Sequence, residues 1–234
     1  MERQMDSAQP KSDMRKLVAF TLPMAVFILF LGLTSEGSRP ESISWFSYPA
    51  YWVFPAQTLI CGALVLWFWR DYELRAPRKV WFAIAIGVAV SVLWIAPQQF
   101  LGFAPRPTGF DPEVFEKGSA LYWPTVLLRF VRLVVVVPLV EEVFWRGFLL
   151  RYLISEKFTA VKIGTFSWLS FGVVTVCFGF SHSRADWIAA LLCGALYNLV
   201  AYRTRSLTSC VVAHALTNLL LGLWIMQTRQ WGFW

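Results

Sequence analysis

Seven long apolar segments dominate this chain, and they constrain its fold more than any other feature. Each reaches or approaches the roughly 20 residues that a helix needs to cross the hydrocarbon core of a membrane. They cover residues 17–34, 50–69, 79–101, 121–150, 164–182, 186–202 and 206–226. Because their apolar residues are continuous rather than alternating, helices are favoured over a β-barrel. We therefore predict an all-α fold, a polytopic transmembrane helical bundle of about seven to eight spans.

The charge distribution fits a membrane protein better than a soluble one. Charged residues make up 15% of the chain, against roughly 25% in soluble domains. The net charge of +7 comes from basic residues beside the apolar segments, which favours the lipid bilayer over nucleic acid as a partner. With a cytoplasmic N-terminus, the inner segments hold thirteen Lys and Arg residues and the outer segments five. This bias predicts a multi-pass protein of a bacterial cytoplasmic membrane with its N-terminus inside.

The sequence indicates one domain. We expect a polar N-terminal tail at residues 1–16 and a single integral membrane domain at 17–234, with a motif-bearing core at about 121–226. The first apolar segment has no convincing small-residue cleavage site, so it is interpreted as a retained span. The four cysteines show no Cys-x-x-Cys spacing and are expected to be buried apolar residues. Five tryptophans are interpreted as interface anchors rather than a lipid-substrate groove: Trp52, Trp67, Trp69, Trp81 and Trp94.

Two adjacent carboxylates, Glu141 and Glu142, lie inside an apolar run, and Arg146 follows them. Ionisable groups in such a run are costly unless they are paired or line a polar cavity, so they mark a candidate functional site. On a helix, Glu142 and Arg146 share a face at a spacing that favours an ion pair. Glu141 is rotated by about 100° from Glu142, so we expect it to face a cavity as a general base. The alternative is that Glu141, Glu142 and Arg146 form one salt-bridge network with a purely structural role.

The helix that carries these residues is expected to be unusually long. From Trp123 to Leu153 the run has 31 residues, about 46 Å at 1.5 Å per residue, against a hydrocarbon core of about 30 Å. It must therefore tilt strongly, or begin or end at the membrane interface. Pro138 is predicted to kink it just before the acidic pair.

The only two histidines also lie in or at the end of apolar runs. His182 is the last residue of the segment Phe178–His182, at the end of the fifth apolar run, and His214 lies one helical turn before Asn218. A lone histidine in a helix is usually a buried core residue, or it makes a hydrogen bond to a neighbouring helix. This chain has two such histidines, together with Asn218 and the buried pair Glu141 and Glu142. One site, formed where three helices meet, is the simplest explanation for all of them.

Three chemistries fit this set. Glu141 and His182 could deprotonate a water, while His214 and Asn218 donate hydrogen bonds to a developing oxyanion. Glutamate with two histidines could instead ligate zinc, but the His-Glu-x-x-His pattern is absent, so we expect no metal and no cofactor. Buried charges could also form an ion pathway, which is disfavoured because no two halves of the chain repeat one another. Serine chemistry is weaker still, and Ser181 is interpreted as structural.

The three motifs, taken in order, resemble one known family. Glu141-Glu142-x-x-x-Arg146, Phe178-x-x-x-His182 and His214-x-x-x-Asn218 look like those of the CPBP family of intramembrane glutamate endopeptidases, the CAAX-protease and bacteriocin-processing family, also called Abi. The stretches 141–150 and 197–218 are also similar to CAAX-protease-related proteins of exosortase systems.

The resemblance implies a role for each motif residue. Glu141 and His182 would activate water, His214 and Asn218 would form the oxyanion hole, and Glu142 with Arg146 would support the site. The implied activity is metal-independent cleavage of a membrane-associated protein or peptide, with a prenylated substrate as one option. The alternative is a non-catalytic membrane scaffold, chaperone or immunity protein that keeps the motifs for structural reasons.

Overall fold

The computed structural model describes residues 8–34, 49–104, 106 and 109–234. Within these ranges the secondary structure consists of helices, turns and bends, with no strand. The predicted all-α fold is therefore confirmed. The predicted tail lies partly outside the described residues, and its part from residue 8 onward is helical, because the first helix begins at Ala8.

Nine α-helical segments are found among the described residues. They are α1 (Ala8–Gly32), α2 (Ala50–Trp67), α3 (Val80–Phe100), α4 (Tyr122–Val131), α5 (Val137–Glu142), α6 (Leu150–Tyr152), α7 (Trp168–Phe180), α8 (Trp187–Thr204) and α9 (Leu207–Thr228). Five segments are long and apolar enough to cross a membrane: Asp13–Gly32, Ala50–Trp67, Val80–Phe100, Arg184–Thr204 and Leu207–Thr228. These correspond to five of the seven predicted spans. The segment predicted at 164–182 contains only the 13 helical residues of α7.

The segment predicted at 121–150 belongs to one continuous helix over residues 122–152. Two π-helical stretches, Arg132–Val136 and Val143–Leu149, separate α4, α5 and α6 within it. Pro138, where we expected a kink, is the second residue of α5, directly after the first π-helical stretch. The two stretches flank the acidic pair on both sides. Single-turn π insertions are frequent at functional sites, where they redirect side chains.

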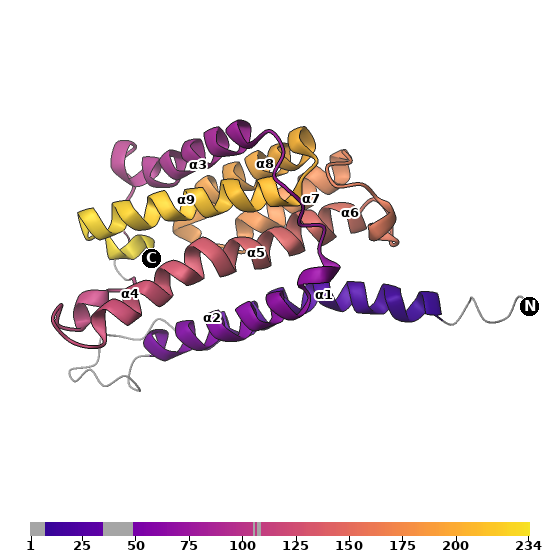
Figure 1. The fold of residues 1–234 in the computed structure, drawn as a ribbon. Helices are drawn as coiled ribbons and strands as arrows, with labels where there is room; N and C mark the ends of the chain where they lie inside the picture. Colours follow the sequence, from indigo (N-terminus) through magenta and orange to yellow (C-terminus); the bar gives the residue numbers. More distant parts are fainter. Residues whose placement is uncertain (1–7, 35–48, 105, 107–108) are drawn as a thin grey trace, which may run out of the picture.

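The long helix lies between two groups of helices (Figure 1). On one side, α1 and α2 pack against each other and against its π-helical stretches. On the other side, α9 packs along the first π-helical stretch and α5, with α3, α8 and α7 beyond it. The three predicted motifs are carried by the long helix, by the end of α7 and by α9. The fold thus brings segments that are far apart in sequence into one bundle.

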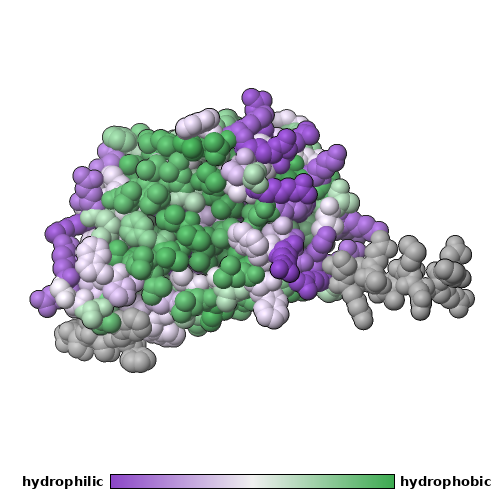
Figure 2. Space-filling model, viewed as in Figure 1, coloured by the Kyte–Doolittle hydropathy of each residue, from purple (hydrophilic) through white to green (hydrophobic). Residues whose placement is uncertain are grey.

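The outer surface is apolar over a broad area between two polar ends (Figure 2). Its large apolar side chains include Leu29, Leu66, Trp81 and Trp168, each more than two thirds exposed. Such side chains are stable on a surface that contacts lipid acyl chains rather than water. Together with the five candidate spans, this surface identifies a multi-pass membrane protein.

Gly87 permits the close contact between α3 and α9. A Cβ atom at this position would lie 2.6 Å from the Ala213 carbonyl oxygen. We expect Gly87→Ala to lower the free energy of unfolding by about 1–3 kcal/mol, because the two backbones must move apart. Thermal unfolding of the purified protein measures this. Gly172→Ala is the matched control, since its Cβ would meet nothing within 4 Å, and equal melting temperatures for both variants would contradict the prediction.

Candidate functional site

Glu142 is the centre of a buried polar network. Its side chain is fully buried, and its Oε1 accepts a hydrogen bond from Arg146 Nη1 at 3.0 Å. The same oxygen lies 2.9 Å from His214 Nδ1, which donates to it when that nitrogen carries the hydrogen. The predicted Glu142–Arg146 ion pair is therefore confirmed. Glu142 also orients His214, a contact that spacing could not predict because the two residues are 72 positions apart.

Arg146 connects the long helix to α8. Its Nε donates to Asn198 Oδ1 at 3.1 Å and its Nη2 donates to the Gly194 carbonyl oxygen at 3.0 Å. Asn198 in turn donates to Thr175 Oγ1 on α7. The faces of the guanidinium are covered by aromatic rings, with the Phe178 centroid at 4.8 Å. A fully buried arginine needs such complete pairing, because an orphan charge in the interior is costly.

Glu141 lies outside this network. Its side chain is 8% exposed, and its Oε2 is buried without a hydrogen-bond partner. Among the described residues, no ion pair or hydrogen bond is found for its carboxylate. The observed pairing thus separates the two glutamates, as the spacing predicted, rather than joining both to Arg146. A carboxylate with free acceptor capacity is what a general base requires.

His182 follows α7 and is fixed by local contacts. Its Nδ1 lies 2.8 Å from the Phe178 carbonyl oxygen, so the tautomer with hydrogen on Nδ1 donates there and leaves Nε2 as an acceptor. Its ring packs against Phe178 and Trp94, with centroids 4.8 and 5.4 Å away. Trp94, one of the predicted interface anchors, thus also contacts His182 with its ring. Ser181 donates to the Phe178 carbonyl oxygen, in agreement with a structural role.

Asn218 joins α9 to the long helix. Its Nδ2 donates to the Leu133 carbonyl oxygen at 2.7 Å, within the first π-helical stretch. One amide hydrogen is thus engaged in a backbone contact. An amide group carries a second hydrogen that can donate elsewhere.

The structure brings some predicted residues together directly and others through aromatic rings. Glu142, Arg146 and His214 are in contact. His182 packs on Phe178, the ring that also covers Arg146. Tyr197 lies between Phe178 and His214, with ring centroids 6.3 and 5.0 Å away. No hydrogen bond links Glu141 to either histidine in the described part of the chain.

Sequence reasoning missed the α8 residues of this site. Tyr197 and Asn198 are both fully buried, and Tyr197 donates to Thr217 Oγ1 at 2.8 Å. Two adjacent polar side chains inside an apolar run were the signal that could have marked them. Among the described residues, no group of three His, Cys, Asp or Glu side chains is arranged to hold a metal ion.

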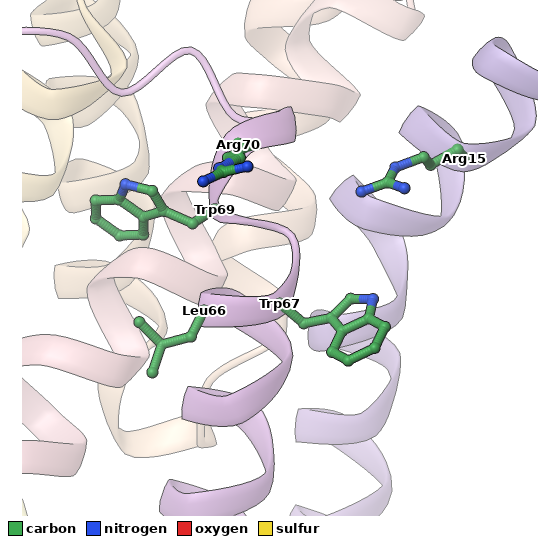
Figure 3. A pocket seen from close by; sticks show the side chains of 5 residues that line it. All are labelled: Arg15, Leu66, Trp67, Trp69 and Arg70. Carbon is green, nitrogen blue, oxygen red and sulfur yellow. The ribbon is translucent and has the colours of Figure 1, made fainter.

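A separate open cavity of about 640 Å³ lies beside α1 and the end of α2. Figure 3 shows its lining side chains, Arg15, Leu66, Trp67, Trp69 and Arg70. None of them is a predicted site residue. Trp67 and Trp69 are exposed here beside two arginines, as expected for residues that anchor a helix end at the membrane interface.

Comparison with known proteins locates a family domain in the chain. Residues 123–220 match the family model described as type II CAAX prenyl endopeptidase Rce1-like, which is less than half of the 234 residues. The curated proteins and the solved structures gave no match. The matched region contains all three motifs, and nothing in it tests the exosortase subgroup, which stays a prediction. Residues 123–220 are thus similar to Rce1-like domains of the type II CAAX prenyl endopeptidases, in agreement with the resemblance to the CPBP family.

Proposed function

We propose that the chain is an intramembrane endopeptidase of the CAAX-protease type, which hydrolyses a peptide bond of a membrane-associated substrate. The carrying observation is the contrast between the two glutamates. Glu142 Oε1 is paired with Arg146 and His214, although its Oε2 is buried without a partner. The neighbouring Glu141 carboxylate has no hydrogen bond or ion pair at all among the described residues. The Rce1-like domain around them supports peptidase chemistry.

In the proposed mechanism, Glu141 and His182 activate the attacking water. Glu141 accepts the proton, because its carboxylate makes no hydrogen bond or ion pair among the described residues. His182 holds the water through Nε2, which is an acceptor when Nδ1 donates to the Phe178 carbonyl oxygen. The proton then passes to the leaving amine, so that one peptide bond and one water become a carboxylic acid and an amine.

The developing oxyanion is stabilised by His214 and Asn218. When His214 Nδ1 donates to Glu142, its Nε2 donates only if both ring nitrogens carry hydrogen. Asn218 supplies the amide hydrogen that the Leu133 carbonyl oxygen does not use. Donors fixed in advance in this way typically contribute the largest share of catalysis in acyl transfer.

Removal of metal ions tests the proposed glutamate mechanism against a zinc mechanism. We expect the reconstituted protein to cleave a membrane-peptide library equally well with and without a strong chelator, because a carboxylate base replaces the metal-bound hydroxide. Product masses measure the cleavage. A loss of cleavage on chelation that added zinc restores would contradict the metal-free mechanism and leave the peptidase assignment standing.

The alternative function is a non-catalytic scaffold, chaperone or immunity protein. It is favoured by the structural hydrogen bonds that Arg146, His214 and Asn218 all make between helices. It gives no reason for the Glu141 carboxylate, which is buried without a hydrogen bond or ion pair among the described residues and is therefore costly in the interior. We also propose a bacterial cytoplasmic membrane with a cytoplasmic N-terminus, on the basis of the lysine and arginine distribution.

A further inference from the structure

Two more arginines are buried near the other end of the long helix. Arg129 and Arg132 are each 5% exposed, and no carboxylate of the described residues lies within the 4 Å of an ion pair from either guanidinium. Both guanidinium carbons lie 4.5 Å from the Phe54 ring centroid, so they are no more than twice that distance apart. Arg132 interacts electrostatically with the Glu141 carboxylate. The Arg129 guanidinium lies beside this like charge without an ion-pair partner among the described residues, and a buried charge of this kind is costly unless it is compensated.

The two guanidiniums differ in their hydrogen bonds. Arg132 donates from Nε to Gln57 Oε1 at 2.6 Å. In Arg129, both Nε and Nη1 are buried without a hydrogen-bond partner. Arg129 also lies 4.7 Å from the Phe110 ring centroid. These aromatic contacts cover the flat faces of the guanidinium, whereas its N–H groups lie in the plane and still require acceptors.

A third unpartnered donor lies close by. The Trp234 ring is 5.8 Å from the Arg129 guanidinium carbon, and its buried Nε1 has no partner either. The nearby acceptors are engaged elsewhere. The Trp234 carbonyl oxygen accepts the Phe110 amide, and Asp111 Oδ1 accepts the Glu113 amide. Among the described residues, three buried donor atoms therefore lack an acceptor here: Nε and Nη1 of Arg129 and Nε1 of Trp234.

A small cavity adjoins Arg129. Its volume is about 10 Å³, about the space that one water molecule occupies. Its lining residues are Phe54, Pro55, Phe110, Thr125, Leu128 and Arg129. Figure 1 shows the ends of α2 and α4 and the C-terminus at the same end of the bundle. The cavity is too small for a lipid headgroup or a peptide end without rearrangement.

We propose that the Arg129 cavity binds a small monovalent anion of the size of chloride. The ion would accept hydrogen bonds from the unpartnered guanidinium N–H groups and offset the charge of the arginine pair. It would also hold Phe110 and Trp234 against α4, because both rings pack on the same guanidinium. This inference is independent of the proposed peptidase function.

Thermal unfolding of the purified full chain tests this proposal. Chloride replaces gluconate at constant ionic strength, with bromide as a second halide and sulfate as a larger anion. We expect chloride and bromide to raise the melting temperature of the wild type by about 2–4 °C at a few times the dissociation constant. Sulfate should give no such rise. A wild type that does not respond to chloride would overturn the proposal.

Arg129→Met provides the matched variant, because it keeps an apolar stem and removes the charge. We expect it to lose the halide response and, in gluconate, to melt at or above the wild-type temperature, since it no longer buries an unpaired charge. The exposed Arg184→Gln should keep the wild-type response. If Arg129→Met responded like the wild type, the site would be elsewhere.

Bromide located by anomalous scattering in wild-type crystals gives an answer that does not depend on the variant folding. Density for bromide beside Arg129 supports the proposal, and its absence there while the melting temperature responds would overturn it. A phospholipid that copurifies with the wild type and not with Arg129→Met would also overturn it, because the occupant would then be a lipid headgroup.

Discussion

Glu141→Gln is expected to reduce peptide cleavage by about 10²–10⁴-fold, the usual contribution of a general base. Glutamine has the same shape as glutamate and can hydrogen-bond to water, but it cannot accept the proton. Because the Glu141 carboxylate makes no hydrogen bond or ion pair in the described part of the chain, the fold should persist. Initial cleavage rates, read beside the melting temperature of each protein, measure both effects.

The matched control is Glu156→Gln, which changes an exposed carboxylate in the same way. It should retain wild-type cleavage. If Glu141→Gln retained it too, Glu141 would not be the base and the scaffold interpretation would gain support. If Glu141→Gln lost its fold together with its activity, Glu141 would be a structural residue instead.

Arg146→Gln is expected to lower the free energy of unfolding by about 3–5 kcal/mol, as is usual when one partner of a buried ion pair is removed. The substitution leaves Glu142 without its ion-pair partner in a fully buried position. It also removes donors from Asn198 and from the Gly194 carbonyl oxygen. The loss should therefore loosen α8 from the long helix. Chemical denaturation of the purified protein measures it.

Arg15→Gln serves as the comparison for Arg146→Gln. Arg15 also pairs with a carboxylate, that of Asp71, but its side chain is 60% exposed. Exposed pairs of this kind contribute little to stability because water solvates the separated charges well. We expect Arg15→Gln to unfold nearly as the wild type does. Equal unfolding midpoints for both variants would mean that the buried network is not a stabilising element.

Sequence patterns predicted those features of the fold that depend on residues close together in the chain. Apolar continuity predicts helices, and the four-residue spacing of Glu142 and Arg146 predicts their ion pair. The length of the helix over residues 122–152 followed in the same way. These features depend on residues that are neighbours in the chain, so periodicity and spacing are sufficient to predict them.

Other features depend on contacts between distant segments. The helical part of the segment 164–182 begins only at Trp168. Gly164 before it has a positive φ and lies against the Ala201 backbone, where a Cβ would be 2.3 Å from the carbonyl oxygen. Hydropathy alone cannot distinguish such a packed turn from a helix. The same holds for the contact of His214 with Glu142 and for the α8 residues around Arg146, which spacing within one helix does not encode.

The measurement that tests the central claim most directly is the cleavage of a prenylated CAAX peptide by the purified, reconstituted chain, with product masses as the readout and Glu141→Gln assayed beside the wild type. The account predicts that the wild type hydrolyses one peptide bond of this membrane-bound substrate and that the variant does not. Equal product from both proteins would contradict the assignment of Glu141. No product from the folded wild type, with this peptide or with any member of the membrane-peptide library, would contradict the peptidase function itself.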